Sequence, residues 1–211
     1  MRRVGKPAPH RILRGNRPGV MVSGPRSGRF AARVELTDGT VALVRRVHPR
    51  DADGLLRFLQ RLSPTSVYLR FCSGGANLRA AMLAFIQVRE DKVGFVAYDL
   101  DGEIVGHAEY VRLPSCRQAE VAVVLSDEMQ GKGLARQLIR MLAVDASTRG
   151  VDEFVATVLP TNGAMLTVFR RAFGARIIED ADSTICEVAF ATVVPPVVAV
   201  PAAGGGQRRA A

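Results

Sequence analysis

The sequence is poor in the residues that usually build metal sites and disulfide frameworks. It has three cysteines, three histidines and no tryptophan among its 211 residues. No pair of cysteines has the C-x-x-C spacing of zinc ligands or redox dithiols, because Cys72, Cys116 and Cys186 lie far apart. The histidines, at positions 10, 48 and 107, are equally dispersed. We therefore expect reduced thiols and no metal site.

Long apolar runs are also missing. No proline-free stretch approaches the roughly 18 residues of a membrane-spanning helix, and no apolar signal-peptide region follows the basic start. We therefore expect a cytoplasmic protein with no membrane contact. The chain length and the hydrophobic content of 48% suffice for one domain with a sizeable core.

The net charge of +9 is concentrated at the two ends of the chain. No acidic residue precedes Glu35, and the rest of the chain is nearly neutral once the terminal Lys and Arg are set aside. Residues 1–30 and 192–211 are rich in Gly and Pro or Ala and lack hydrophobic periodicity, which predicts disordered tails around a domain at 31–191. For the basic N-terminal tail, nucleic-acid contact stays open as an accessory role, with a solvated extension as the alternative.

Regular patterning begins at about Arg33. Residues 33–47 contain two strand-like pieces around Asp38-Gly39, a pair that favours hairpin turns. Leucines at helical spacing then predict a helix within residues 48–63. Two shorter helices are predicted at 63–71 and 78–87.

An antiparallel meander follows, with two strands joined at Asp101-Gly102 and a third close behind. The remaining elements alternate between helix and strand and end in a hairpin. The segments concerned are 92–113 and 118–127 for the meander, 134–150 and 162–173 for helices, 152–160 for a strand and 175–190 for the hairpin. This order predicts an α/β fold with a mixed sheet, in which a βαβ unit across 118–160 supplies the parallel pair.

Residues 129–139, MQGKGLARQLI, place two glycines one residue apart between a strand and a helix. Such a turn presents unpaired backbone N–H groups and the positive end of a helix dipole at one point, which favours phosphate binding. Gly131 and Gly133 let the backbone approach the anion, and Lys132 and Arg136 add positive charge. For a G-x-G pair taken alone, a plain strand-to-helix turn remains an alternative.

Two common phosphate motifs do not match this turn. A P-loop has a hydroxyl residue after its lysine, but Lys132 is followed by Gly133. A dinucleotide fingerprint requires a small residue where Arg136 stands and an acid at the end of the next strand, whereas Asp152 begins its strand.

QGKGLA, residues 130–135, resembles the Q/R-x-x-G-x-G/A pyrophosphate loop of the GNAT superfamily of acyl-CoA-dependent N-acetyltransferases. TNGAMLTVFRRAFGA, residues 161–175, resembles the late helix of that family. LSPTSVYLRF, residues 62–71, is similar to a signature of the GNAT domains of bacterial protein-lysine acetyltransferases. The likeness extends over the elements from about Arg33 to Phe190.

The resemblance implies a GNAT fold in which the strand before the loop splays from its parallel neighbour and receives the pantetheine arm of acetyl-CoA. It assigns coenzyme contacts to one set of residues: Val123, Val124, Leu125, Gln130, Gly131, Lys132, Gly133, Leu134, Ala135, Arg136 and Asn162. Asn162 is also placed to cap the helix after Pro160. Tyr68 and Arg70 are implied as acceptor-site residues, with ordinary packing as the alternative.

Glu120 is the candidate general base, because an amine acceptor must lose a proton before it attacks. It is an isolated carboxylate in a strand that is apolar on both faces, so we expect desolvation to suit it for proton uptake. The resemblance places a base glutamate at the same position. The alternative is an edge-of-sheet glutamate paired with an arginine such as Arg117. Phe169 stands where many GNAT enzymes have the tyrosine that protonates the leaving thiolate, which leaves the general acid unassigned.

These inferences predict an N-acetyltransferase that moves an acetyl group from acetyl-CoA to a primary amine, with a protein lysine as the first candidate. A small-molecule amine is the alternative acceptor. A non-catalytic acyl-CoA-binding domain is the alternative of a different class.

Overall fold

The computed structural model of the chain describes residues 32–73, 75–114, 117–179 and 184–193. The predicted tails lie outside the described residues except for Thr192 and Val193. Thr192 is buried, donates its backbone N–H to the Asp152 carbonyl and donates its hydroxyl to the Val151 carbonyl. The folded part therefore extends past the expected boundary at residue 191.

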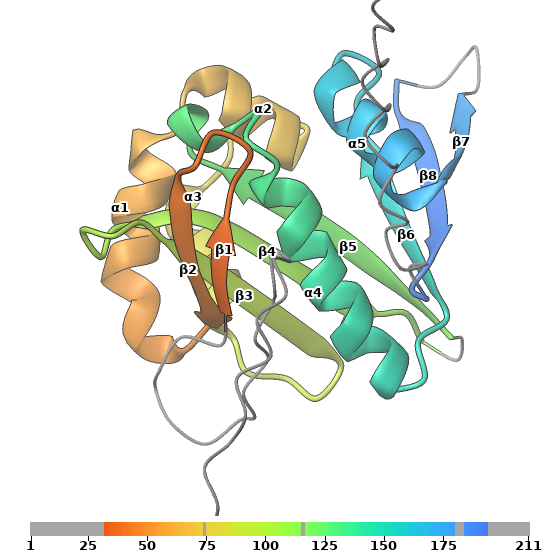
Figure 1. Cartoon of the computed structure of the whole chain (residues 1–211), viewed down its shortest axis with the longest axis horizontal. Helices are drawn as coiled ribbons and strands as arrows, with labels where there is room; N and C mark the ends of the chain where they lie inside the picture. Colours follow the sequence, from red (N-terminus) through yellow and green to blue (C-terminus); the bar gives the residue numbers. More distant parts are fainter. Residues whose placement is uncertain (1–31, 74, 115–116, 180–183, 194–211) are drawn as a thin grey trace, which may run out of the picture.

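Eight strands form one sheet in the order β1-β2-β3-β4-β5-β6-β8-β7 (Figure 1). The first five are antiparallel neighbours in chain order. They are β1 (Ala32–Glu35), β2 (Val41–Arg46), β3 (Lys92–Tyr98), β4 (Ile104–Arg112) and β5 (Gln118–Leu125). The turns at Asp38-Gly39 and Asp101-Gly102 each place the glycine at a positive φ, +83° and +84°. The predicted hairpin and meander are therefore confirmed.

The second part of the sheet contains β6 (Glu153–Val158), β7 (Arg176–Glu179) and β8 (Cys186–Ala191). β5 and β6 are parallel and are joined by the helix α4 (Leu134–Thr148), which confirms the predicted βαβ unit. β8 pairs antiparallel with both β6 and β7 and lies between them. The sequence predicted the final hairpin but not this insertion of its second strand.

Helices cover both faces of the sheet. α1 (Ala52–Arg61), α2 (Pro64–Phe71) and α3 (Leu78–Ile86) contribute to one apolar cluster, together with Val96, Ile104 and Val124 of the sheet. α4 and α5 (Gly163–Phe173) contribute to a second cluster against the opposite face, which Val121 and Leu125 join from β5. Alternate residues of β5 thus face different layers, as expected for a strand covered on both sides.

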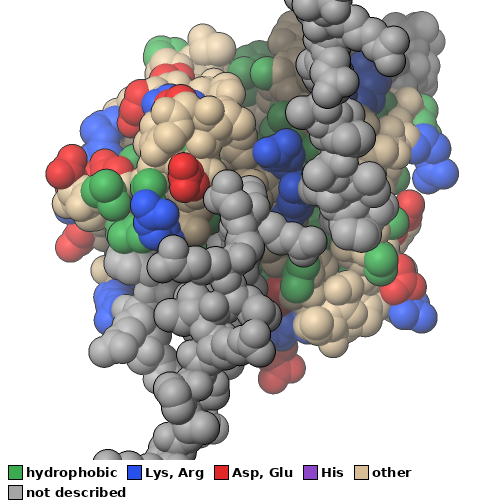
Figure 2. All heavy atoms as spheres, in the orientation of Figure 1, with side chains coloured by type: hydrophobic (Ala, Val, Ile, Leu, Met, Phe, Trp, Pro, Cys, Tyr) green, Lys and Arg blue, Asp and Glu red, His purple; other side chains and the backbone are tan. Residues whose placement is uncertain are grey.

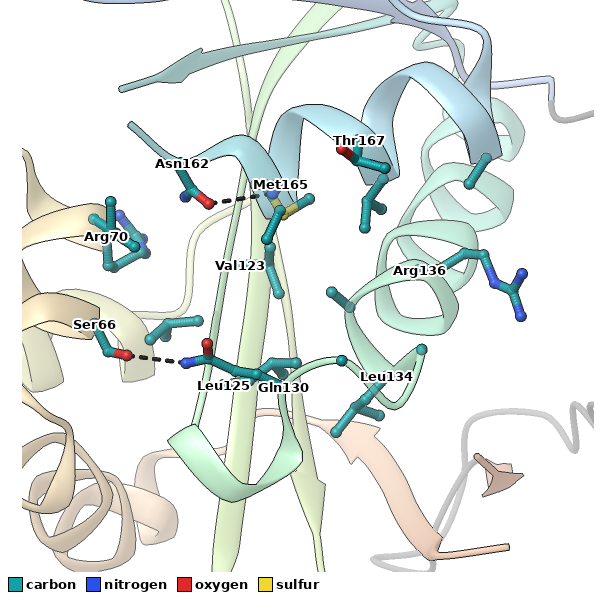
Figure 3. A pocket seen from close by; sticks show the side chains of 18 of the residues that line it. Ser66, Arg70, Val123, Leu125, Gln130, Leu134, Arg136, Asn162, Met165 and Thr167 are labelled. Carbon is teal, nitrogen blue, oxygen red and sulfur yellow. Dashed lines mark hydrogen bonds between the residues drawn. The ribbon is translucent and has the colours of Figure 1, made fainter. Parts of the chain in front are cut away.

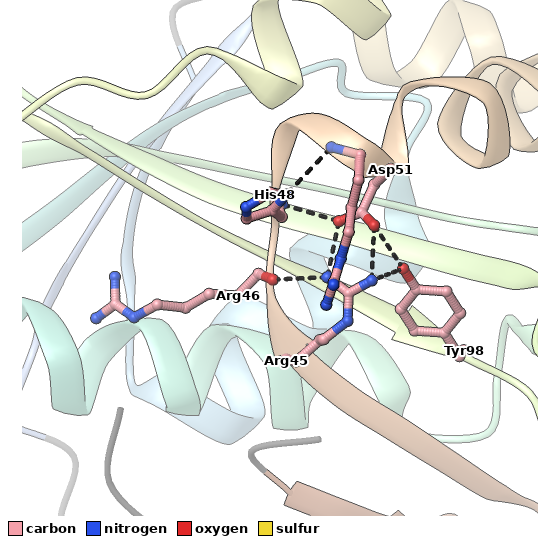
Figure 4. Close-up of polar contacts among 6 residues, drawn as sticks. Arg45, Arg46, His48, Asp51 and Tyr98 are labelled. Atoms are coloured by element: carbon pink, nitrogen blue, oxygen red, sulfur yellow. Dashed lines mark hydrogen bonds and ion pairs between the residues drawn. The ribbon is translucent and has the colours of Figure 1, made fainter. Parts of the chain in front are cut away.

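A buried polar network fixes the start of α1 against the sheet. Asp51, in the 3-10 turn η1 (Pro49–Asp51), is 5% exposed and accepts hydrogen bonds from Arg45, from Tyr98 and from the backbone of His48 (Figure 4). Burial of a carboxylate is tolerated when it is paired and hydrogen-bonded in this way. The Arg45 guanidinium forms a bidentate pair with it at 2.6 and 2.8 Å.

No helix in the described residues is both long enough and apolar enough to cross a membrane. Nor do the described residues contain a group of three or more His, Cys, Asp or Glu side chains arranged to hold a metal ion.

Candidate functional site

The site begins where the two parallel strands separate. β5 and β6 pair only at Gln118–Glu153, Ala119–Phe154 and Glu120–Val155, although both strands continue beyond these residues. A cavity of about 390 Å³ opens at this gap (Figure 3). Its walls are Val123–Leu125 of β5, the glycine turn, α4 and α5 on one face of the sheet, and α2 on the other. The cavity therefore connects both faces through the sheet.

The glycine turn provides a row of backbone donors. Gly131 and Gly133 have φ of +72° and +87°, a region that side-chain-bearing residues rarely adopt. Gly133 is the N-cap of α4 and makes no side-chain capping bond. The N–H groups of residues 131–136 have no acceptor among the described residues. These donors and the helix dipole favour an anion at this point.

The charged side chains that line the cavity are all arginines, namely Arg70, Arg136 and Arg171. Figure 2 shows Lys and Arg side chains gathered over α4 near the middle of this face. The rest of the lining is mainly apolar, with contributions from Leu69, Met165 and Val168 that the sequence did not single out. An apolar channel that ends at backbone donors and guanidinium groups suits a long, mostly uncharged ligand with an anionic end.

Lys132 is not among the cavity-lining residues. Its ammonium pairs with Asp38 at 3.0 Å, and its carbonyl accepts hydrogen bonds from the Thr37 backbone N–H and hydroxyl. Hydrogen bonds from Thr40 and from Lys132 lower the pKa of Asp38 to about 2. The Lys132 side chain therefore secures the loop to the β1–β2 turn, and its predicted contribution of positive charge stays a prediction. Arg136 and Arg171 are the cationic side chains beside the turn that line the cavity.

Asn162 lies at the opposite wall of the cavity. Its Oδ1 accepts a hydrogen bond from the Met165 backbone N–H at 3.2 Å and caps α5 (Figure 3). The predicted capping role is confirmed, and its place in the lining is compatible with the predicted ligand contact. Phe169, by contrast, is 2% exposed and packs against Phe173 and Phe190 in the core.

Glu120 is exposed and does not line the cavity. The strand is apolar, but the exposed Glu120 side chain does not have the desolvated surroundings that the sequence predicted. The alternative pairing with Arg117 is also wrong, since Arg117 pairs with Asp152 at 2.7 Å. Glu120 is instead close enough to Arg70 to interact with it electrostatically. Its role as a base stays a prediction.

The two expected acceptor-site residues on α2 have different surroundings. Tyr68 is 45% exposed and does not line the cavity, whereas Arg70 does. Arg70 contacts Glu109 at 3.1 Å, and the second oxygen of Glu109 binds Lys92 at 2.8 Å. Glu109 is not among the residues that the sequence motifs single out. The sequence feature that could have identified Glu109 is a charged residue within the mostly apolar strand β4. His107 lies two residues earlier, on the same face of that strand.

Comparisons with known sequences agree with this geometry. A family model described as the Acetyltransferase (GNAT) family matches residues 65–175. Acetyltransferase Pat of Mycolicibacterium smegmatis is 30% identical over 171 residues, which cover 80% of this chain and 50% of that protein. Acetyltransferase PA5475 of Pseudomonas aeruginosa is 32% identical over 152 residues, 66% of this chain and 81% of that protein. The chain thus spans about half the length of the Pat relative.

Comparison of structures gives the same result. The crystal structure of the GNAT domain of S. lividans PAT matches with a TM-score of 0.69 and 30% sequence identity. The match covers 76% of this chain and 96% of that domain. Together with the splayed strands and the glycine turn, these matches show that the chain belongs to the GNAT family of acetyltransferases.

Proposed function

We propose that this protein transfers an acetyl group from acetyl-CoA to the side-chain amine of a protein lysine. The observation that carries the proposal is the cavity through the β5–β6 gap, with free backbone donors at one end and access from the α2 face at the other. Such a passage lets the acyl donor and the amine enter from different faces of the sheet and be held close together for direct transfer.

The residues present fit acetyl-CoA. The N–H groups of residues 131–136 suit the pyrophosphate, and Arg136 and Arg171 suit its negative charge. Main-chain groups of Val123–Leu125, which β6 does not pair, suit the amides of the pantetheine arm. When bound, acetyl-CoA supplies a thioester whose C–S bond breaks as the amine nitrogen bonds to the carbonyl carbon.

Glu120 is proposed to accept the amine proton, directly or through a water molecule. It lies at the point where the strands part and on the strand face that α2 approaches, so an incoming lysine would pass it. Its exposure agrees with relay through water. Phe169 cannot donate a proton, and the thiolate is a sufficiently good leaving group for solvent to protonate it.

The choice of a protein lysine is supported by the relatives named Pat and by the likeness of residues 62–71 to the protein-lysine group. The identities of about 30% support the class of acceptor and no particular protein. The acceptor is therefore tested separately from the acyl donor.

Calorimetric titration with acetyl-CoA tests the binding site. We expect binding by the wild type and a loss of at least about tenfold in affinity for Gly133→Glu, which places a carboxylate among the anion-binding amides. The matched control is Gly102→Glu, because Gly102 has a similar φ of +84° in a turn outside the cavity. Equal loss in both variants, or no binding by the folded wild type, would contradict the proposal.

Turnover with lysine-containing proteins and with small polyamines then identifies the acceptor class. Acetylation of a protein substrate supports the lysine proposal. Turnover with small amines alone would contradict the lysine proposal and identify a small-molecule acetyltransferase. Binding of acetyl-CoA without turnover of either class of acceptor would indicate a non-catalytic domain.

A further inference from the structure

Two arginines on α4 carry positive charge that the helix itself does not balance. Arg136 and Arg140 lie four positions apart, so their side chains leave the same face of α4, about 6 Å apart along its axis. Like charges at this spacing destabilise a helix. Asp145, the acidic residue of α4, binds Arg46 and Arg149 instead. We call Arg136 and Arg140 the arginine pair.

The arginine pair also lacks anionic partners elsewhere in the described chain. Within residues 32–73, 75–114, 117–179 and 184–193, neither guanidinium forms an ion pair, and the Nε of each is buried without a hydrogen-bond partner. Burial, and then the nearby charge of Arg136, lowers the pKa of Arg140. A partly buried charge without a partner is unfavourable, and a bound anion would offset this penalty.

The arginine pair extends the anion-binding end of the cavity along α4. Arg136 lines the cavity directly after the glycine turn, whereas Arg140 is outside the lining, one turn farther from Gly133. In Figure 3 the Arg136 side chain points away from Val123, along which the pantetheine arm is proposed to lie. Figure 2 shows cationic side chains at the surface over α4. The pair therefore offers an anion site at the outer edge of the cavity.

Coenzyme A has one anionic group that the proposed pyrophosphate contacts leave unmatched, the 3′-phosphate of its ribose. This group is a phosphate monoester, with a charge of about −1.5 to −2 at neutral pH. Only the ribose separates it from the pyrophosphate, a span comparable with the single helical turn between the two arginines. Guanidinium groups bind phosphate through paired N–H donors. A pyrophosphate at the glycine turn would therefore bring the 3′-phosphate within reach of the arginine pair.

We propose that Arg140, beside Arg136, binds the 3′-phosphate of coenzyme A and selects this coenzyme over 3′-dephospho-coenzyme A. The inference rests on the proposed function for the class of ligand. Arg140 is a specificity-determining residue in this scheme and takes no part in the chemistry, because the 3′-phosphate is remote from the thioester. Arg136 lies between the two phosphate positions and serves both.

Calorimetric titration of the full chain with coenzyme A and with 3′-dephospho-coenzyme A tests the site. We expect the wild type to bind coenzyme A more tightly by about tenfold, the effect of one charge-assisted contact. In Arg140→Gln the ratio of the two affinities should fall to about threefold or less, with the affinity for 3′-dephospho-coenzyme A unchanged. A purely structural role for Arg140 would weaken binding of both coenzymes equally.

The matched control is Arg149→Gln, which removes one positive charge from the C-terminal end of the same helix, outside the cavity lining. Its ratio of affinities should equal that of the wild type. In turnover assays, Arg140→Gln should raise the KM for acetyl-CoA with little change in kcat, because the 3′-phosphate contact is the same in the ground state and the transition state. The comparison of the two coenzymes on the wild type does not depend on the stability of any variant.

Failure of this site and failure of the proposed function give different results. Equal affinities of the wild type for the two coenzymes, or an unchanged ratio in folded Arg140→Gln, would refute the 3′-phosphate site and leave the proposed function intact. Absence of binding of either coenzyme by the folded wild type would refute both.

Discussion

Glu120 is the last residue of β5 that pairs with β6, so it stands at the opening of the gap. Its position on the strand matches the sequence-based assignment, while its exposure does not. Solvent access is compatible with a base that works through water, since the proton then has a path out of the site.

Glu120→Gln is predicted to lower kcat by about 100-fold, a typical loss when a general base is removed. Acetyl-CoA affinity should be unchanged, because the side chain does not line the coenzyme cavity. Steady-state turnover and calorimetry on the same preparation measure the two effects. Glu128→Gln is the control, since Glu128 is an exposed carboxylate that also lies outside the lining. Full activity of Glu120→Gln would exclude this base.

At the scale of elements, the β1–β2 hairpin holds the glycine turn through contacts with Lys132. Thr37 donates two hydrogen bonds to the Lys132 carbonyl, and Asp38 pairs with the Lys132 ammonium. A trans peptide points its carbonyl and the following N–H in opposite directions. Holding the Lys132 carbonyl therefore also fixes the direction of the Gly133 N–H, one of the proposed anion donors.

Asp38→Asn is predicted to raise the KM for acetyl-CoA by about two- to fivefold with little change in kcat, because it loosens the loop without touching the chemistry. Asp101→Asn is the control, as Asp101 occupies the same place in the other Asp-Gly hairpin turn and is also exposed. The difference in KM between Asp38→Asn and Asp101→Asn should shrink at high salt, because salt screens exposed ion pairs. A lowered kcat with unchanged KM for Asp38→Asn would contradict this role.

At the scale of the whole molecule, a buried charge cluster lies between β3, β4 and α2. His107 is fully buried and stacks on Phe85 with ring centroids 4.0 Å apart. Its Nε2 is 3.9 Å from Glu109, which binds Lys92 and Arg70. Burial is the main reason that the pKa of His107 falls to about 4. The histidine is thus neutral in the folded protein at neutral pH.

This lowered pKa predicts a pH-dependent stability. The unfolded chain takes up a proton at His107 near pH 6.5, whereas the folded protein does so only near pH 4. Stability should therefore decline as the pH falls through this window, by an amount on the order of 3 kcal/mol. Denaturant unfolding of the wild type and of His107→Gln at several pH values measures it. If the stability of His107→Gln declines equally steeply as the pH falls, groups other than His107 cause the effect.

The types of the elements and the position of the glycine turn were predictable because their signals are local. Asp-Gly pairs determine tight turns, the leucines of α1 repeat at helical spacing, and Gly131 and Gly133 permit the positive φ that the turn requires. The coenzyme contacts on β5, the turn, α4 and α5 follow from the resemblance to the GNAT family and stay predictions.

Only the tertiary structure decided what depends on residues distant in the sequence. The insertion of β8 between β6 and β7, the exposure of Glu120 and the pairing of Lys132 with Asp38 each depend on which elements pack together. The same holds for Ser66, whose hydrogen-bond partners Asp127 and Gln130 lie more than 60 residues away. Sequence periodicity reports which face of an element is apolar but not which element covers that face.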